Sequence, residues 1–292
     1  QLQQVMEKKL LKNKLKMAVI FKEDGHIYES LNEHLEKDKI KWTSVTSFVG
    51  MFKPKFNAES QAKKSSKNKR SKWYKIPPKK ILEIWNKESE RAIELGNWYH
   101  NEREKRLLEF STIERDGVEV PIIKPLTDNT GIKIAPKQKL SDGVYPEHFV
   151  YLKSAGLCGQ ADLVSIVNGK INILDYKTNK EIKKKGFTNW EGITSKMYNP
   201  VNHLDDCNLK HYNLQLSLYA YIIKKHNPKL KIGELKIQHV IFEEEGKDKH
   251  GYPINKYIDG EPVVKEIIIY ELPYLKDEIQ SLIMWLKDNP LC

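Results

Sequence analysis

The strongest constraint on the fold comes from two runs rich in Val and Ile that flank the dipeptide Asn168-Gly169. Such runs on either side of Asn-Gly predict a β-hairpin closed by a two-residue type I′ turn. If those two residues form the whole loop, residue 167 faces residue 170, and the register is fixed along both strands. Counting outward from the turn, Asp162 then faces Asp175, with Cβ atoms roughly 5 Å apart.

This register places two acidic side chains opposite each other, which destabilises an ordinary sheet. Side chains alternate along a strand, so Lys177 shares the face of Asp162 and Asp175. A divalent cation is the natural compensation, because Mg²⁺ or Mn²⁺ takes carboxylate oxygens and holds water that can become a nucleophile. The alternative is a solvated hairpin in which the lysine simply neutralises the pair. Apolar residues on the same face favour a face turned toward the core: Val164, Ile166, Ile171 and Ile173.

Length and charge limit the kind of protein this can be. The chain has 292 residues and a formal net charge of +11. It is long enough to bury a sizeable core, and its positive charge favours a polyanionic partner, although a merely basic surface fits as well. No long apolar run indicates a membrane span, and the chain does not begin with a signal-peptide pattern. Three widely spaced cysteines form no C-x-x-C pair, so we expect a reducing, cytoplasmic compartment.

A basic tract occupies residues 60–80, with no acidic residue between positions 63 and 80. One interpretation is contact with phosphates, combined with stacking of bases on an aromatic side chain, as in single-strand binding. The other is a solvated, mobile loop. The candidate nucleic-acid contacts are Lys63, Lys64, Lys67, Lys69, Arg70, Lys72 and Trp73.

Two stretches with helical periodicity lie on either side of the hairpin in the sequence, at residues 79–110 and about 205–226. The first contains Gly96-x-x-x-His100. A glycine inside a helix costs about 1 kcal/mol relative to alanine, and here it would let another backbone approach. The second places Gln215 and Tyr219 one turn apart on one face. Taken alone, a histidine or tyrosine on a helix is usually a packing residue.

In their order along the chain, these motifs resemble the PD-(D/E)XK nuclease superfamily, and within it the RecB-type exonuclease branch, in the form of a stand-alone phage or bacterial member. The resemblance rests on Gly96-x-x-x-His100, Gly159-x-x-Asp162, Asp175-x-Lys177 and Gln215-x-x-x-Tyr219. A further segment is similar to phage-borne members: His26-x-Tyr28 followed by Ser44-Val45-Thr46. We interpret His26 itself as a turn residue.

The resemblance implies an α/β fold with a central mixed β-sheet flanked by helices. It also implies metal-dependent hydrolysis of DNA phosphodiester bonds, most directly as an exonuclease in recombination, repair or phage DNA processing. One or two Mg²⁺ or Mn²⁺ ions would be held by His100, Asp162, Asp175 and a backbone carbonyl at Leu174 or Tyr176. The implied catalytic residues are Asp162, Asp175, Lys177, Gln215 and Tyr219, with Glu147 and Gly96 in support. Some similar nucleases hold an iron–sulfur cluster on four cysteines, and this chain has too few.

We expect an N-terminal segment at residues 1–78 that carries the basic tract, followed by a nuclease core at 79–292. Insertions are expected near 111–143 and 183–203, and the whole should form one compact unit. Two alternatives remain open. One is a structure-specific endonuclease or nickase. The other is a non-catalytic nucleic-acid-binding or adaptor protein with a nuclease-like fold, working with recombination or replication proteins. The presence of Asp162, Asp175 and Lys177 together argues against the non-catalytic alternative.

Overall fold

The computed structural model describes residues 18–22, 27–31, 37, 39–127, 132–135 and 137–291. His26, which we interpreted as a turn residue, lies outside these ranges.

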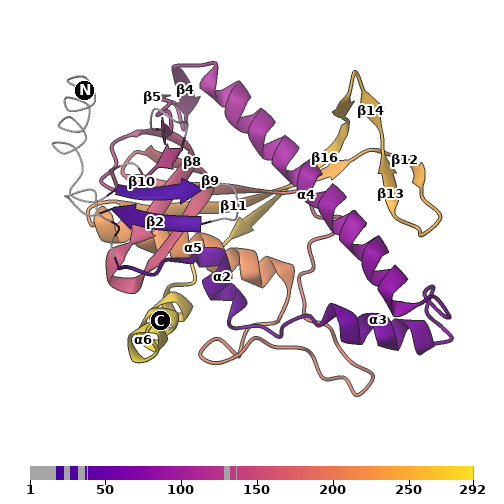
Figure 1. Ribbon diagram of the computed structural model, residues 1–292. Helices are drawn as coiled ribbons and strands as arrows, with labels where there is room; N and C mark the ends of the chain where they lie inside the picture. The colour runs from indigo at the N-terminus through magenta and orange to yellow at the C-terminus, as the bar shows by residue number, and fades with distance from the viewer. Residues whose placement is uncertain are drawn as a thin grey trace.

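Within the described residues, six strands form a mixed sheet at the centre of the molecule (Figure 1). Its order is β16-β11-β10-β9-β3, and β8 also pairs with β9. The β10–β11 and β3–β9 pairs are parallel, whereas β8–β9, β9–β10 and β11–β16 are antiparallel. The strands are β3 (Thr43–Ser44), β8 (Gly143–Leu152), β9 (Leu157–Val167), β10 (Lys170–Lys177), β11 (Lys231–Phe242) and β16 (Val264–Leu272).

The predicted hairpin is confirmed in its turn and in its register as far as Leu163 and Leu174, but the expected pair of Asp162 and Asp175 lies beyond the last ladder pair. Val167 of β9 lies opposite Lys170 of β10. Asn168 and Gly169 have φ angles of 51° and 70°, as the two central positions of a type I′ turn require. The apolar face also turns inward as expected, because its residues all lie in the main core: Val164, Ile166, Ile171 and Ile173.

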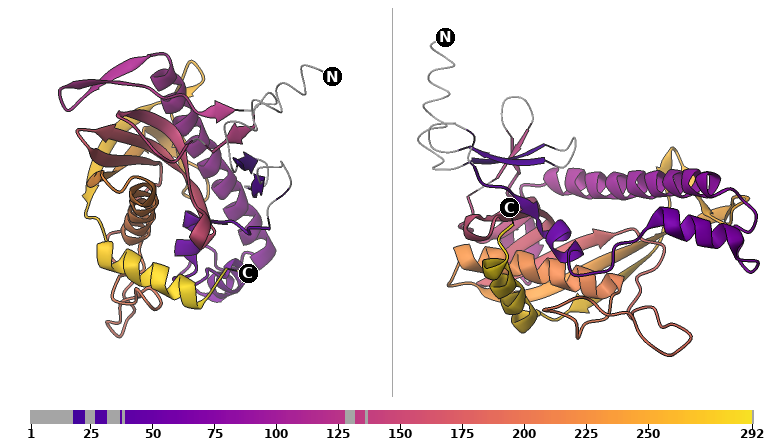
Figure 2. Two further views of the ribbon diagram at one scale, coloured as in Figure 1. Left: turned by 90° about the vertical axis from the view of Figure 1, so that its left-hand side faces the viewer. Right: turned by 60° about the horizontal axis from the view of Figure 1, so that its bottom comes forward.

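Helices cover both faces of the sheet (Figure 2). On one face, α5 (Asn208–His226) packs against the sheet together with α2 (Val45–Gly50) and α6 (Lys276–Asp288). On the other face lies α4 (Pro78–Leu108), whose Tyr99 contacts Tyr176 of β10 and Phe242 of β11. The predicted α/β class, a central mixed sheet flanked by helices, is therefore confirmed.

Smaller elements surround this core, and four of them, β4 to β7, lie in the region where we expected an insertion at 111–143. There β7 pairs with β1 in the middle of a separate four-stranded sheet, whose order is β2-β1-β7-β6. The elements are β1 (Ala18–Lys22), β2 (Ile27–Leu31), α3 (Ala58–Lys67), β4 (Thr112–Arg115), β5 (Val118–Pro121), β6 (Leu126–Thr127), β7 (Lys133–Ile134), η2 (Lys153–Ala155), β12 (Glu244–Lys247), β13 (Pro253–Asn255), β14 (Tyr257–Ile258) and β15 (Glu261–Pro262).

Residues on both sides of the expected boundary at 78/79 contribute to one core. Ser44 caps the N-terminus of α2 by accepting a hydrogen bond from the backbone N–H of Ser47 at 3.0 Å. The helix that follows buries Val45 and Phe48 in the main core. The segment expected as an insertion at 183–203 buries Val201 there as well. No helix in the described ranges combines the length and apolar character needed to cross a bilayer.

Candidate active site

The site lies where β9 changes partner along one of its edges. β8 pairs with β9 over nearly its whole length, so β10 and β3 must share the opposite edge. β10 pairs with β9 from the turn as far as Leu163, and β3 pairs with only the first two residues of β9. Between these two partners, the edge from Gly159 to Asp162 is left open.

Side-chain alternation along β9 breaks at the same point. Ala161 and Val164 both lie in the main core, although residues three apart on a regular strand point to opposite faces. The register with β8 places Glu147 opposite Asp162, and Glu147 has a φ of 48°, a left-handed conformation that costs about 1–3 kcal/mol for a non-glycine residue. The Asp162 carboxylate accepts a hydrogen bond from the backbone N–H of Tyr176 at 2.6 Å, which ties β9 to β10 beyond their last ladder pair.

From the other face of the sheet, α4 brings His100 to these carboxylates. Its Nδ1 lies 3.5 Å from Asp162 Oδ1 and 3.9 Å from Glu147 Oε1. The Nε2 group of Gln160 donates a hydrogen bond of 2.7 Å to the other carboxylate oxygen of Glu147. Donor atoms of His100, Glu147 and Asp162 all lie within 4.8 Å of one another. One imidazole and two carboxylates in this arrangement fit a divalent cation.

The pKa values show how strongly this cluster attracts positive charge. Burial raises the pKa of the Asp162 carboxyl, and the charge of Asp175 raises it further. Burial would lower the pKa of His100, but the hydrogen bond to Glu147 and the surrounding carboxylate charges raise it to about 9. With no cation bound, the protonated imidazole therefore supplies part of the positive charge that the acids require, and it must lose this proton to bind a metal.

Asp175 and Lys177 complete the cluster from β10. Asp175 is only 1% exposed, and the Lys177 ammonium forms an ion pair with its Oδ2. Burial would lower the pKa of Lys177, but the charges of Asp175 and Asp162 raise it above the usual range of a lysine. The lysine therefore stays charged. Its Nζ also lies 4.9 Å from the ring centre of Tyr212 on α5.

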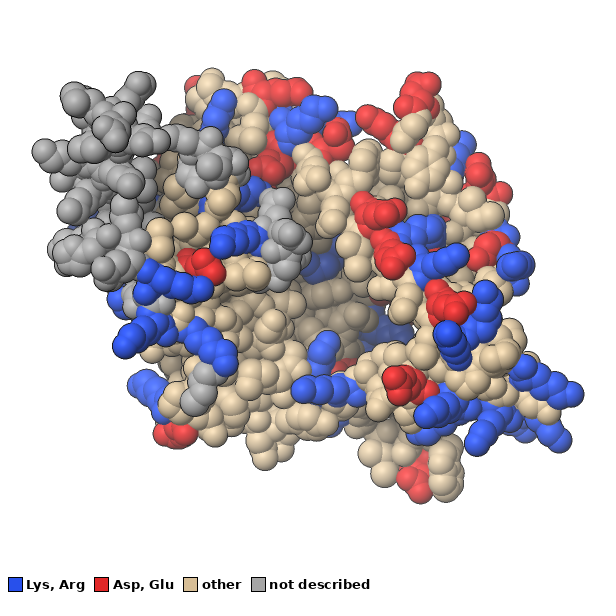
Figure 3. Space-filling view, in the orientation of Figure 1, with Lys and Arg blue, Asp and Glu red and all other residues tan. Residues whose placement is uncertain are grey.

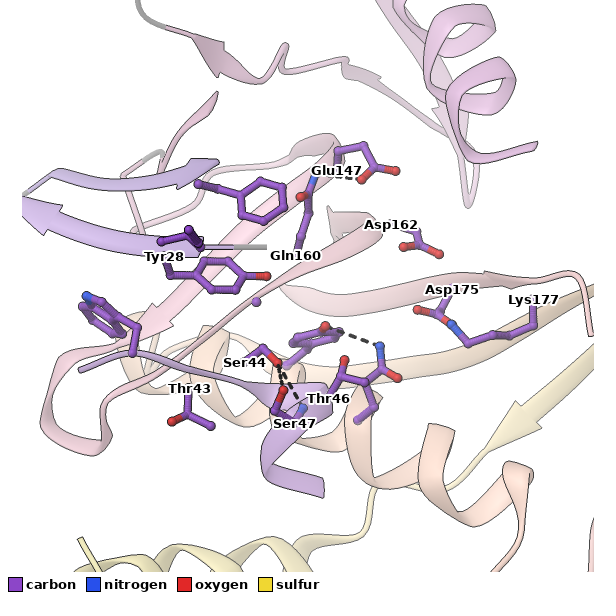
Figure 4. A pocket seen from close by; sticks show the side chains of 16 residues that line it. Tyr28, Thr43, Ser44, Thr46, Ser47, Glu147, Gln160, Asp162, Asp175 and Lys177 are labelled. Carbon is purple, nitrogen blue, oxygen red and sulfur yellow. Dashed lines mark hydrogen bonds and ion pairs between the residues drawn. The ribbon is translucent and has the colours of Figure 1, made fainter. Parts of the chain in front are cut away.

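The carboxylates of Glu147, Asp162 and Asp175 line a pocket of about 740 Å³ (Figure 4). Gln215 and Tyr219, the pair predicted from α5, line it, and Gln215 Nε2 donates to the Tyr219 hydroxyl at 3.4 Å. A Cβ atom on Gly159 would lie 2.8 Å from a ring carbon of Tyr219, so only glycine permits this approach. Gly96 has a similar place on α4, where a Cβ would lie 3.3 Å from Thr178 Oγ1. Figure 3 shows the molecule hollowed near its centre, with lysine and arginine side chains around the hollow.

One wall of the pocket was not predicted as part of the site. It comes from the N-terminal elements, with the phenol of Tyr28 on β2 and the hydroxyls around the start of α2. The similarity of His26-x-Tyr28 and Ser44-Val45-Thr46 to phage-borne nucleases was the available signal. The wall consists of Phe21, Ile27, Tyr28, Trp42, Thr43, Ser44, Thr46 and Ser47.

The structure corrects part of the prediction for the basic tract. Its first part, as far as Lys67, forms helix α3, and residues 68–77 form the turns that lead into α4. Trp73 is only 7% exposed and packs against Trp85 and His250, so the prediction that it stacks on bases is wrong. The Lys72 Nζ lies 4.7 Å from the Trp73 ring centre and donates to the carbonyl of His250, so we assign it to packing. The other candidate contacts are exposed: Lys63, Lys64, Lys67, Lys69 and Arg70.

Comparison with known proteins places these residues in a family. A stretch of 98 residues, 32% of this chain, is 34% identical to the RecBCD enzyme subunit RecB of Borreliella burgdorferi and covers 8% of that protein. The chain thus spans only a small part of this relative. Residues 56–289 match the PD-(D/E)XK nuclease superfamily, and this match includes the whole cluster around Asp162 and Asp175. The chain therefore belongs to the PD-(D/E)XK nuclease superfamily.

Proposed function

We propose that this protein is a metal-dependent deoxyribonuclease that acts as an exonuclease. The observation that carries the proposal is the cluster of His100, Glu147, Asp162 and Asp175 with Lys177 beside it. The two aspartates are buried, His100 and Glu147 are partly buried, and the three carboxylates line a pocket. Three acids this close together, two of them buried, are unfavourable unless positive charge compensates them. The RecB-type order of the motifs supports the exonuclease mode.

Each side chain can be given a role from its position. His100, Glu147 and Asp162 would hold the Mg²⁺ or Mn²⁺ ion, and Asp175 lies next to them with one oxygen engaged by Lys177. Such a cation would supply Lewis-acid activation of water and of the scissile phosphate. Lys177, kept charged by its neighbours, would orient the attacking water or contact a phosphate oxygen.

This ligand set differs from the one implied by the resemblance. Glu147 joins it, since its carboxylate faces His100 and Asp162. We assign Tyr176 a supporting role, because its backbone N–H binds Asp162 and its ring contacts His100, with ring centres 5.6 Å apart. Gln215 and Tyr219 would form the wall that faces the DNA.

The substrate and setting follow from the charge and from the RecB likeness. A net charge of +11 and the exposed cations of α3 support DNA as the partner. The likeness to a RecB subunit supports work in recombination, repair or phage DNA processing, in the cytoplasm of a bacterial or phage-infected cell and together with recombination or replication proteins.

A digestion panel tests the proposal. Wild-type protein is incubated with linear, nicked, closed circular and single-stranded DNA, each with Mn²⁺ and with a chelator. We expect loss of linear DNA, survival of closed circles, and no cleavage with the chelator. Asp162→Asn should lose about 100-fold or more of the activity. It should still fold, since an amide oxygen can accept the hydrogen bond of Tyr176.

Asp277→Asn, on the exposed first turn of α6, is the matched control and should cut normally. Cleavage of closed circles, which have no ends, would mean that the protein is an endonuclease or nickase and not an exonuclease. If no DNA is cut under any of these conditions, the enzyme proposal is wrong and an adaptor role takes its place.

A further inference from the structure

The segment that follows β10 carries three large apolar side chains into solvent. Phe187, Trp190 and Ile193 are 77%, 91% and 63% exposed. Among the described residues, Trp190 is the most exposed of the large hydrophobic side chains. Burying a tryptophan would remove about 150–250 Å² of surface from water. A single exposed apolar residue is ordinary, but three large ones within seven residues form the kind of apolar surface that marks an interaction site. In Figure 1 this segment belongs to the loops that extend below α5.

The loop is held in one shape by its own hydrogen bonds. The Asn189 side-chain oxygen accepts from the backbone N–H groups of Glu191 and Ile193 at 3.0 and 2.9 Å. The hydroxyls of Thr188 and Thr194 lie 2.9 Å apart across the base of the loop. The exposed apolar side chains are therefore presented by an ordered turn, so little entropy is lost when something binds them.

The base of the loop is attached to the helix that lines the active site. The backbone N–H of Leu209, in the first turn of α5, donates to the carbonyl of Lys183 at 3.1 Å. The backbone N–H of Gly186 donates to Asp205 Oδ2 at 3.1 Å. Gln215 lies seven residues along α5 from its first residue, Asn208, which corresponds to roughly 10 Å. A strand that leaves the pocket along α5 would meet this loop.

The charge of the loop indicates what binds there. Lys183, Lys184 and Lys185 precede Phe187, and all three are exposed. In the part of the chain that the structure describes, none of the three forms an ion pair, and the Lys184 Nζ lies 5.2 Å from the ring centre of Tyr270 on β16. Residues 183–193 hold three lysines against one acidic residue, Glu191. Lysines beside an exposed indole match single-stranded nucleic acid, in which phosphates contact the cations and unpaired bases stack on the ring.

We propose that residues 183–193 bind single-stranded DNA beside the active site, with a base stacked on Trp190 and phosphates on the three lysines. This inference rests on the proposed function for the identity of the nucleic acid. In a duplex the bases are already paired and stacked, so a single strand should gain more from the indole than a duplex does.

The test measures binding without cleavage. Labelled oligodeoxythymidine and a blunt duplex of equal length are titrated, in the presence of a chelator, into a protein carrying Asp175→Asn. In that background, Trp190→Ala should weaken single-strand binding about 5- to 100-fold and duplex binding much less. Trp190→Phe should retain most of the affinity, because it keeps an aromatic face. Phe56→Ala, at another exposed aromatic residue, is the matched control and should bind as the background does.

Single-strand affinity of Trp190→Ala within twofold of the background would overturn the inference and assign the loop to a protein partner. An equal loss for single strand and duplex would overturn it as well. The melting temperature should not change, since the indole is almost fully solvated. If the oligonucleotide binds through Trp190 but the wild-type protein cuts no DNA, the binding site stands and the nuclease proposal fails.

Discussion

At the residue scale, Gly159 sets how closely β9 can approach α5. Gly159→Ala places a methyl group 2.8 Å from the Tyr219 ring, which is closer than atoms can pack. We expect the free energy of unfolding to fall by about 1–3 kcal/mol, as overpacked cores usually show. Cleavage should fall too, because the displaced ring belongs to the pocket wall. Denaturant titration measures the first effect.

Gly246→Ala is the control for this change, because a Cβ there meets no atom within 4 Å. Unchanged stability of Gly159→Ala would mean that Tyr219 can move away at little cost.

Lys177 provides a second prediction at this scale. Lys177→Ala should abolish cleavage but retain or tighten Mn²⁺ binding. The ammonium is paired with Asp175 and competes with a cation for the same carboxylates, so its removal makes the local potential more negative. Calorimetric titration of Mn²⁺ alongside a cleavage assay measures both effects. Lys170→Ala, at the exposed opposite end of the same strand, should change neither.

The comparison for this test is Asp162→Asn, which should lose metal binding and cleavage together. If Lys177→Ala loses as much Mn²⁺ affinity as Asp162→Asn, the lysine supports the structure of the site and the role assigned to it is wrong.

Individual residues differ in how well the sequence predicts them. Asp162, Asp175 and Lys177 follow from an Asn-Gly turn and simple counting, because strand register is a local property. We propose a larger part for Glu147 than the sequence predicts, since no local pattern indicates a left-handed glutamate inside a strand. Trp73 was predicted wrongly because its neighbours, such as His250, are distant in the sequence.

At the scale of the element, the position of α4 decides whether His100 reaches the carboxylates. Gly96 faces Thr178 immediately after β10, and a Cβ at 96 would lie 3.3 Å from the threonine hydroxyl. Gly96→Ala gains about 1 kcal/mol of helix propensity and introduces this tight contact. We therefore expect a melting temperature near that of the wild type, with cleavage reduced severalfold as the helix shifts away.

Thr178→Ala in the same chain should restore cleavage, because it removes the atom that the new methyl group meets. The two single variants, the double variant and the wild type form a double-mutant cycle. A thermal melt and an initial-rate assay are measured for each. Normal cleavage by Gly96→Ala would show that Thr178 rotates aside, and that the spacing between α4 and β10 does not depend on the glycine.

The long elements were predicted from periodicity, and their bounds agree with the structure to within a few residues. Helix α4 was expected at 79–110 and spans Pro78–Leu108. The opening in the sheet was not predicted. It depends on β3, which has only two residues, taking the edge of β9 that β10 leaves. A strand this short has no periodicity, and its partner lies more than a hundred residues away in the chain.

At the scale of the whole molecule, charge should govern how DNA is held. The chain carries a net charge of +11, and in Figure 3 lysine and arginine side chains gather at the lower right, where Figure 1 shows α3. Each lost phosphate contact should lower the slope of log K against log salt by roughly 0.7 to 0.9. We replace five cations by glutamine: Lys63, Lys64, Lys67, Lys69 and Arg70.

Measured in the Asp175→Asn background, this variant should bind DNA more weakly and with a flatter salt dependence. The control replaces five exposed lysines from other elements, which should leave the slope nearly unchanged: Lys225, Lys229, Lys231, Lys276 and Lys287. Equal slopes for the two variants would mean that these five cations add only general charge and no defined contacts.

The same titrations separate the two proposed DNA contacts, because base stacking and phosphate contacts depend differently on salt. Stacking on Trp190 releases no counterions, so Trp190→Ala should weaken single-strand binding by a similar factor at every salt concentration. The variant that lacks the five cations should instead approach the affinity of the background as salt rises. At high salt, screening weakens the same phosphate contacts in the background protein. Affinity measured at several salt concentrations therefore gives parallel lines for the first variant and converging lines for the second. Converging lines for Trp190→Ala would mean that the loop acts through its lysines and that no base stacks on the indole.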